Sequence, residues 1–171
     1  LDLARLEGQE LKLDATSVND FQNLVLEPAI EIILPEIEKK RMILIREIPD
    51  PPFEVNGDPD LLKIVLVNLL GNAAKYGREE GTIRVTLRRE PPGIHIAVWN
   101  EGPGFPISER SRLFRKFSRI KTPALLQRKG TGVGLYTCWK IIQRHGGRIM
   151  ADSEEGHWAE FSFTIPQPLP A

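Results

Sequence analysis

The stretch DPDLLKIVLVNLLGNAAKYG, residues 58–77, predicts a central helix and with it much of the fold. Asp58 is a good N-cap, and Gly77 is placed to end the helix. At about 100° per residue, the aliphatic side chains form one broad apolar stripe. Asn68 and Asn72 lie one above the other beside that stripe, because residues four apart share a helix face. Two amides on a largely apolar helix need partners.

Those partners are open to two interpretations. Asn68, Asn72 and Lys75 fall within a sector of about 60°, so their side chains converge. One interpretation is a structural amide pair satisfied by the backbone, with Lys75 at a solvated edge. The other is a binding site, because amide oxygens suit Mg²⁺ or water and a lysine suits phosphate. The helix by itself does not decide between them.

Composition indicates an ordinary globular domain. A chain of 171 residues with 41% hydrophobic content is long enough for one domain with a real core. Its formal net charge is zero, so no global charge argues for nucleic acid or an anionic membrane. Cys138 is the single cysteine, which excludes an intramolecular disulfide and favours a reducing compartment. We find no apolar run long enough to span a bilayer.

The remaining pattern predicts an α+β fold. Alternating apolar residues and turn signals bound a set of short strands, and longer periodic segments predict further helices. The expected strands are residues 11–15, 42–48, 83–87, 94–98, 148–151 and 158–165, and the further helices run from residue 19 or 20 to about 40, over 108–117 and over 131–144. These elements predict a two-layer α/β sandwich, with helices on one face of a mixed, mostly antiparallel sheet.

Two glycine-rich segments follow the central helix. In NEGPGF, residues 100–105, Gly102 and Gly104 would let the backbone approach a flat ligand, and Asn100 can both donate and accept. An ordinary turn explains the same residues. In KGTGVGL, residues 129–135, glycines open a helix whose N-terminal amides can bind an anion. The second segment matches neither a P-loop nor a dinucleotide fingerprint.

A basic segment lies between the two glycine-rich segments. From Arg112 to Lys129 there are seven basic residues and no acidic one. A solvated loop is one interpretation, and a mobile lid over a polyphosphate is the other.

Taken together and in this order, these segments resemble the catalytic, ATP-binding domain of sensor histidine kinases, in the wider Bergerat-fold ATPase group. Residues 68–76 resemble the N box of that family, 101–105 the G1 box, 113–117 the F box and 130–135 the G2 box. The resemblance implies a catalytic domain over residues 11–166 with a flexible ATP lid. It also implies the end of a dimerisation helix or a linker at 1–10, and a tail at 167–171.

The resemblance also implies ATP and Mg²⁺ as ligands and assigns roles. Asn72 would be the metal ligand, and Asn68 would contact metal-bound water or phosphate. Lys75 would face the phosphates, and Arg119 matches a lid arginine that reaches the terminal phosphate, so Asn68, Lys75 and Arg119 are the catalytic candidates. The implied nucleotide-binding residues are Asn68, Asn72, Lys75, Tyr76, Asn100, Gly102, Gly104, Phe117, Gly130, Thr131, Gly132, Val133, Gly134 and Leu135.

Two positions depart from patterns in the group. Hydrolytic members usually carry a glutamate where Asn68 stands, and an amide cannot act as a general base near neutral pH. Asn68 therefore favours phosphoryl transfer to a protein over hydrolysis. The kinases usually carry an aspartate where Asn100 stands. Asn100 can still accept a hydrogen bond from adenine, but without charge assistance, so we expect weaker but real ATP binding.

The family's phosphoacceptor histidine is missing. His95, His145 and His157 do not stand in its sequence context. We therefore expect transfer of the γ-phosphate to a histidine on a separate dimerisation domain, with a response regulator downstream and a homodimeric full-length protein. We expect no nucleic acid partner, no membrane contact by this segment and a cytoplasmic location, whether or not the full-length protein is membrane-anchored. The alternatives are a degenerate nucleotide-sensing or docking module and a hydrolytic Bergerat-fold ATPase.

Overall fold

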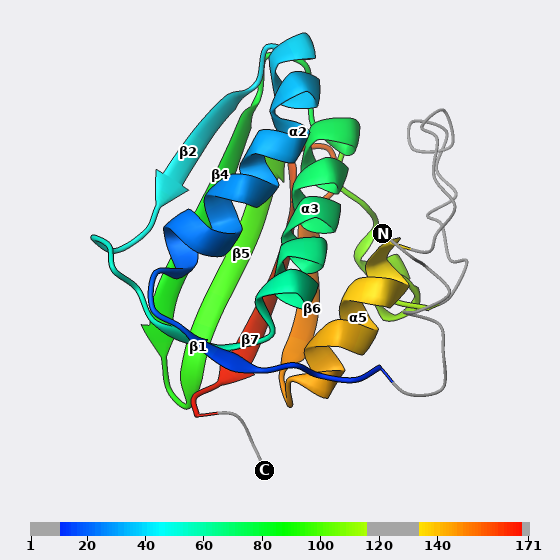
Figure 1. Ribbon diagram of the computed structural model, residues 1–171. Coiled ribbons are helices and arrows are strands. Elements are labelled where there is room, and N and C mark those ends of the chain that lie inside the picture. The colour runs from blue at the N-terminus through cyan, green and yellow to red at the C-terminus, as the bar shows by residue number, and fades with distance from the viewer. Residues whose placement is uncertain (1–10, 116–133, 169–171) are drawn as a thin grey trace.

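A five-stranded sheet covered on one face by helices forms the centre of the computed structural model, which describes residues 11–115 and 134–168 (Figure 1). The strands lie in the order β2-β4-β5-β7-β6. β2 pairs with β4 in parallel, and the other neighbours are antiparallel. The strands are β2 (Ile43–Glu47), β4 (Thr82–Glu90), β5 (Gly93–Glu101), β6 (Arg148–Glu154) and β7 (Trp158–Pro166). The predicted α+β sandwich with a mixed, mostly antiparallel sheet is confirmed.

Helices form the second layer. The central helix α3 (Pro59–Tyr76) lies between α2 (Glu27–Lys39) and α5 (Gly134–Arg144) and contacts both (Figure 1). Two short helical segments, the π-helix η1 (Gln22–Leu26) and the 3-10 helix η2 (Ile107–Arg112), complete the helical elements of the described ranges. None of the helices within residues 11–115 and 134–168 has the length and apolar character needed to cross a lipid bilayer.

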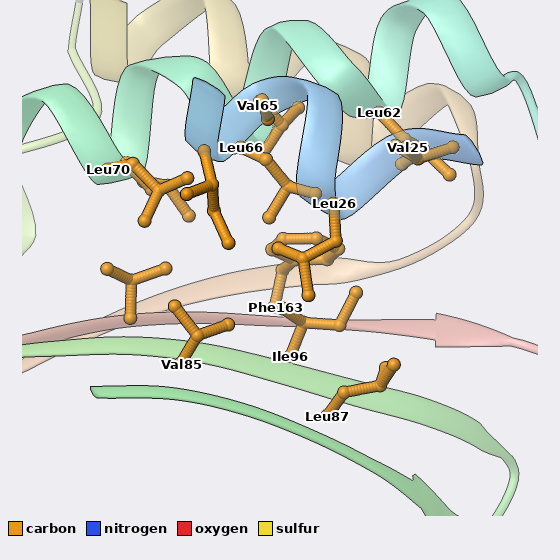
Figure 2. Close-up of a cluster of buried hydrophobic side chains, with 14 of the residues drawn as sticks. Val25, Leu26, Leu62, Val65, Leu66, Leu70, Val85, Leu87, Ile96 and Phe163 are labelled. Carbon is orange, nitrogen blue, oxygen red and sulfur yellow. The ribbon is translucent and has the colours of Figure 1, made fainter. Parts of the chain in front are cut away.

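The main core lies between α3 and the sheet. Figure 2 shows side chains of η1 and α3 pointing toward the strands, with the ring of Phe163 among them. Alternation along β5 and β7 sends every second residue into this layer, as the sequence predicts. The core side chains labelled in the figure are Val25, Leu26, Leu62, Val65, Leu66, Leu70, Val85, Leu87, Ile96 and Phe163.

Both predicted ends of α3 are confirmed. Asp58 is extended, and its carboxylate accepts a hydrogen bond from the Leu61 amide at 3.1 Å, which makes it the N-cap. The same carboxylate accepts from the Asp14 amide at 2.8 Å, so it also holds the preceding chain. Gly77 follows the last helical residue, and a Cβ there would overlap Met42 and the helix carbonyl of Ala73. These contacts fix the length and the position of the helix that carries the two amides.

The structure corrects several predicted boundaries. The strand expected at residues 11–15 is wrong: β1 (Thr16–Val18) pairs with β3 (Val55–Gly57) in a separate two-stranded sheet, and β3 was not predicted. Leu11 and Leu13 alternate because their side chains pack against the core, although their backbone joins no strand.

The helix expected from residue 19 or 20 to about 40 is confirmed: the chain is helical from Phe21 to Lys39, and the Asp20 carboxylate accepts from the Asn23 amide at 3.2 Å. Its first turns, however, are the π-helix η1. The segment before α2 is a π-turn in which the Glu27 amide donates to the Gln22 carbonyl. Pro28, which has no N–H to donate, follows directly. The helix expected over residues 108–117 is a 3-10 turn over Ile107–Arg112 within the described chain.

Candidate functional site

Asn68 lies where α3 meets the start of α5. Its amide nitrogen donates to the Ile64 carbonyl at 2.8 Å, which fixes the side chain in one orientation. Its amide oxygen faces the first residue of α5: a Cβ placed on Gly134 would lie 2.7 Å from that oxygen. The glycine therefore allows the two helices to approach at this point. The nitrogen of Asn68 is satisfied by backbone, as the structural interpretation predicts. Its oxygen instead faces the second glycine-rich segment.

Asn72, Lys75 and Tyr76 continue along the same helix. Asn72 is half-buried, and its side chain makes no hydrogen bond to the part of the chain that the structure describes. The ammonium of Lys75 lies 5.4 Å from the centre of the Tyr76 ring, within range of a cation–π contact. An amide, an ammonium and an aromatic ring thus follow one another toward the C-terminal end of α3.

The two glycines of the first glycine-rich segment pack against protein backbone. A Cβ on Gly102 would lie 2.8 Å from the Tyr76 carbonyl, so this glycine joins the turn after β5 to the end of α3. Gly104 has a positive φ of 61°, and a Cβ there would overlap the hydroxyl of Ser153. That hydroxyl accepts from the Phe105 amide at 2.8 Å. Tight packing is therefore one reason for these glycines, beside the nucleotide pocket that the resemblance implies.

Asn100 is buried at the end of β5, with 4% of its surface exposed. Its amide nitrogen donates to the Glu101 carbonyl at 3.2 Å. Rotating the amide by half a turn would set its oxygen against that carbonyl, so the observed orientation is the favourable one. The side-chain oxygen is thereby left as the acceptor at this position. Sequence reasoning had left donor and acceptor roles both open.

One small hydrophobic cluster brings the four predicted motifs together. Its buried members Phe105 and Leu113 come from the segments that resemble the G1 and F boxes. Tyr76 from the N-box segment and Leu135 from the G2-box segment pack against them. The ring of Phe114 meets that of Phe161 edge-on, with centroids 6.3 Å apart. Four segments spread over about 60 residues of chain therefore share one packing unit beside the amides of α3.

Several predicted site residues lie outside the described ranges. They are Phe117, Arg119, Gly130, Thr131, Gly132 and Val133. The predicted basic lid from Arg112 to Lys129 falls mostly in the same gap, so the lid stays a prediction.

The residues present are compatible with a metal held mainly by its substrate. Within the described ranges, no cluster of three or more His, Cys, Asp or Glu side chains could hold a metal ion. Mg²⁺ needs no such cluster, because it keeps several waters and commonly binds through one or two protein oxygens plus phosphates. The amide of Asn72 can supply such an oxygen.

Sequence reasoning missed the residues that support the site. Glu101 accepts from the Thr82 amide at 2.9 Å and pairs with Arg78 at 2.5 Å, which holds the segment between α3 and β4 against the end of β5. Hydrogen bonding from Thr82, with a further contribution from Arg78, lowers the pKa of the Glu101 carboxyl. His145, 1% exposed, accepts from the Asp58 amide at 3.0 Å and so links α5 to the cap of α3. The sequence analysis placed Glu101 in the segment that resembles the G1 box, but it assigned a supporting role to neither Glu101 nor His145.

Comparison with known proteins decides the family. The family described as "Histidine kinase-, DNA gyrase B-, and HSP90-like ATPase" matches residues 57–169. The chain belongs to this ATPase family. Adaptive-response sensory kinase SasA of Synechococcus elongatus is 33% identical over 171 residues, which cover 97% of this chain and 42% of SasA. The chain thus spans less than half the length of this curated relative.

Solved histidine kinases share the fold of this ATPase family member. The catalytic domain of histidine kinase ThkA aligns with a TM-score of 0.77 and 30% identity, covering 90% of this chain and 98% of that one. ThkA has also been solved in complex with response regulator protein TrrA, and that structure aligns at a TM-score of 0.76 and 27% identity over 96% of this chain and 48% of ThkA. Full-length ShkA in complex with AMPPNP aligns at 0.82 and 28% identity, covering 98% of this chain and 34% of ShkA. This chain is a catalytic ATPase domain of the histidine kinase type.

Proposed function

We propose that this domain binds ATP·Mg²⁺ beside the C-terminal half of α3 and presents the γ-phosphate to a histidine on a separate dimerisation domain. The observation that carries the proposal is the junction of the four motifs: one hydrophobic cluster joins them, and the oxygen of Asn68 faces Gly134. Chemistry of this kind depends on positioning and charge neutralisation more than on covalent steps by the protein.

Successive residues of α3 contact different parts of the ligand. Asn72 contributes an amide oxygen to Mg²⁺, and Asn68 contacts metal-bound water or phosphate through its oxygen. Lys75 faces the phosphates, and Tyr76 packs near the nucleotide. A bound Mg²⁺ would neutralise phosphate charge beside Asn72. Arg119, Phe117 and the residues from Gly130 to Leu135 complete the proposed set, with the basic segment as its lid.

The amide of Asn68 favours phosphoryl transfer to a protein over hydrolysis of ATP. An amide cannot accept a proton from water at neutral pH, and the nitrogen of this amide already donates to Ile64. The base that deprotonates or orients the histidine comes from the dimerisation domain. A hydrolytic ATPase would need a carboxylate where Asn68 stands.

Asn100 favours a working site over a degenerate one. Its buried oxygen is oriented as an acceptor by the hydrogen bond from its nitrogen to Glu101. Such an acceptor can bind the adenine amino group, without the charge assistance of an aspartate. We therefore infer weaker but specific ATP binding.

The proposed partners follow from the same role. ShkA was solved with AMPPNP and ThkA with a response regulator. We infer that this domain acts in a homodimeric kinase, next to its own histidine domain and upstream of a response regulator. It contacts neither nucleic acid nor membrane, and it works in the cytoplasm.

The test is a transfer assay. The domain is mixed with the dimerisation domain of the same kinase and radiolabelled ATP, and protein-bound and free phosphate are followed separately. We expect acid-labile label on the dimerisation domain and little free phosphate. Release of free phosphate without transfer would identify a hydrolase, and ATP binding with neither product would identify a docking module.

A further inference from the structure

The side chain of Lys40 ends against the last turn of α3. Its ammonium donates to the carbonyls of Ala74 at 2.7 Å, Lys75 at 3.2 Å and Gly77. An ammonium carries three N–H donors, so these three acceptors match it. The last carbonyls of a helix lack partners within the helix and carry partial negative charge. Lys40 therefore supplies both the donors and the charge that this helix end requires.

The end of α2 fixes Lys40 in place. Arg41 adopts the left-handed conformation with φ 53°, and the Met42 amide donates to the Ile37 carbonyl at 3.0 Å, which are features of a Schellman helix end. The carbonyl of Lys40 itself accepts from the Glu80 amide at 2.9 Å, in the loop that follows α3. The side chain of Lys40 thus binds the last turn of α3, and its backbone carbonyl binds the loop that follows.

The C-terminal end of α3 is part of the proposed nucleotide site. The C-terminal ends of α2 and α3 lie side by side at the top of Figure 1. The turn that Lys40 binds carries Lys75 and Tyr76, and a Cβ on Gly102 would lie only 2.8 Å from the Tyr76 carbonyl. A shift of this turn would move the predicted phosphate-facing ammonium and the turn after β5 together.

We propose that Lys40 is a positioning residue for the nucleotide site. It holds the last turn of α3 in the geometry that places Lys75 and Tyr76, without contacting the nucleotide itself. The inference rests on the proposed function, since it assumes that ATP·Mg²⁺ binds beside this turn.

The experiment compares nucleotide affinity in variants of the chain. Lys40→Met keeps an unbranched apolar stem and removes the donors and the charge. Lys40→Leu makes the same removal with a different shape and serves if the first variant does not fold. Leu87→Ala is the control, because Leu87 is 2% exposed in the core on β4 and truncation there lowers stability at a distance from the site. Calorimetric titration with ATP·Mg²⁺ gives the dissociation constant, and thermal melting shows that each variant is folded.

We expect either Lys40 variant to weaken ATP·Mg²⁺ binding about tenfold, because small displacements of positioning groups have large effects. Leu87→Ala should bind within about twofold of the unmodified chain despite its lower melting temperature. Unchanged affinity in a folded Lys40 variant, or an equal loss in Leu87→Ala, would overturn the inference. If the unmodified chain binds no ATP, the proposed function fails first and the role of Lys40 fails with it.

Discussion

Asn68 and Asn72 share one face of α3 but differ in what holds them. The nitrogen of Asn68 is bound within the helix, whereas the side chain of Asn72 has no hydrogen-bond partner among the described residues. Replacing Asn68 therefore disturbs both a local bond and the contact with α5. Replacing Asn72 removes little from the fold, so its effect reports on the ligand.

Asn72→Ala should weaken binding of ATP in the presence of Mg²⁺ by about tenfold or more, with stability changed by less than about 0.5 kcal/mol. Removing Mg²⁺ with EDTA should reduce the difference between the variant and the unmodified chain, since the lost interaction is with the metal. Calorimetric titration with and without metal measures both effects. Lys63→Ala, on another side of α3, is the matched control. Equal metal dependence in both chains would exclude Asn72 as the ligand.

Asn100→Asp tests the orientation of the amide. The variant restores the residue usual in the kinases, but it replaces the nitrogen that donates to Glu101 by an oxygen. A buried acceptor facing a carbonyl should cost about 1–3 kcal/mol of unfolding free energy at pH 7. Protonation of the new carboxyl restores a donor, so the loss should shrink toward pH 5. Urea unfolding at both pH values measures this loss of stability. A variant as stable as the unmodified chain at pH 7 would contradict the assigned orientation of Asn100.

At the scale of elements, the junction between α5 and the cap of α3 depends on the protonation of His145. Nδ1 of the ring lies 2.8 Å from the Ile141 carbonyl and donates to it, and Nε2 accepts from the Asp58 amide. The bond from the Asp58 amide requires the neutral ring, because a protonated Nε2 has no lone pair with which to accept. Burial lowers the pKa of His145 from its usual value, against opposing effects of the Ile141 carbonyl and the Asp58 carboxylate. Burial, with the nearby Arg88, also lowers the pKa of His95.

The domain should therefore lose stability in mild acid. An unfolded histidine has a pKa near 6.5 and binds a proton below it, while the folded His145 resists protonation until lower pH. Unfolding free energy should be steady above about pH 7 and fall as the pH drops through 6.5 toward the lower folded value. Urea unfolding across this range measures the slope. His145→Gln should be less stable at pH 7.5 and show a flatter slope, because the buried ring no longer titrates, and an unchanged slope would contradict the role of His145.

The contact between α3 and α5 allows a second test at this scale. A methyl group on Gly134 would lie 2.7 Å from the oxygen of Asn68, so Gly134→Ala should displace that oxygen. We expect about tenfold weaker ATP·Mg²⁺ binding. Gly71→Ala is the control: its methyl would meet only Ile33 at 3.6 Å, and removing a mid-helix glycine should add about 0.5–1 kcal/mol of stability. Unchanged affinity in Gly134→Ala would show that Asn68 does not contact the nucleotide.

At the scale of the whole molecule, Cys138 reports on global unfolding. Its side chain is fully buried between α5 and α3, with the sulfur 3.8 Å from the Val65 carbonyl. Burial raises the pKa of the thiol, so little of the reactive thiolate forms. Native protein should resist iodoacetamide, and alkylation should rise with urea along the same transition as circular dichroism. Rapid alkylation without denaturant would contradict the packing of α5 on α3.

The sequence predicted local features well and long-range contacts poorly. Helical periodicity was enough to place Asn68 and Asn72 on one face, because that relation spans a single turn. The contact of Asn68 with Gly134 depends on how two helices cross, and no periodicity reports it. β3 was missed because three residues ending in Gly57 are too short for an alternating pattern. The sequence assigned no role to Lys40, since only the fold brings the end of α3 to it.

The cluster that joins the four motifs restricts how such domains can diverge. Tyr76, Phe105, Leu113 and Leu135 pack in one unit, so a larger side chain at one of these positions must be matched by a smaller one at another. Across homologous chains, we expect compensating changes at these positions despite their distance in sequence. Selection is therefore expected to act on the shared packing of these four positions, although each belongs to a different motif.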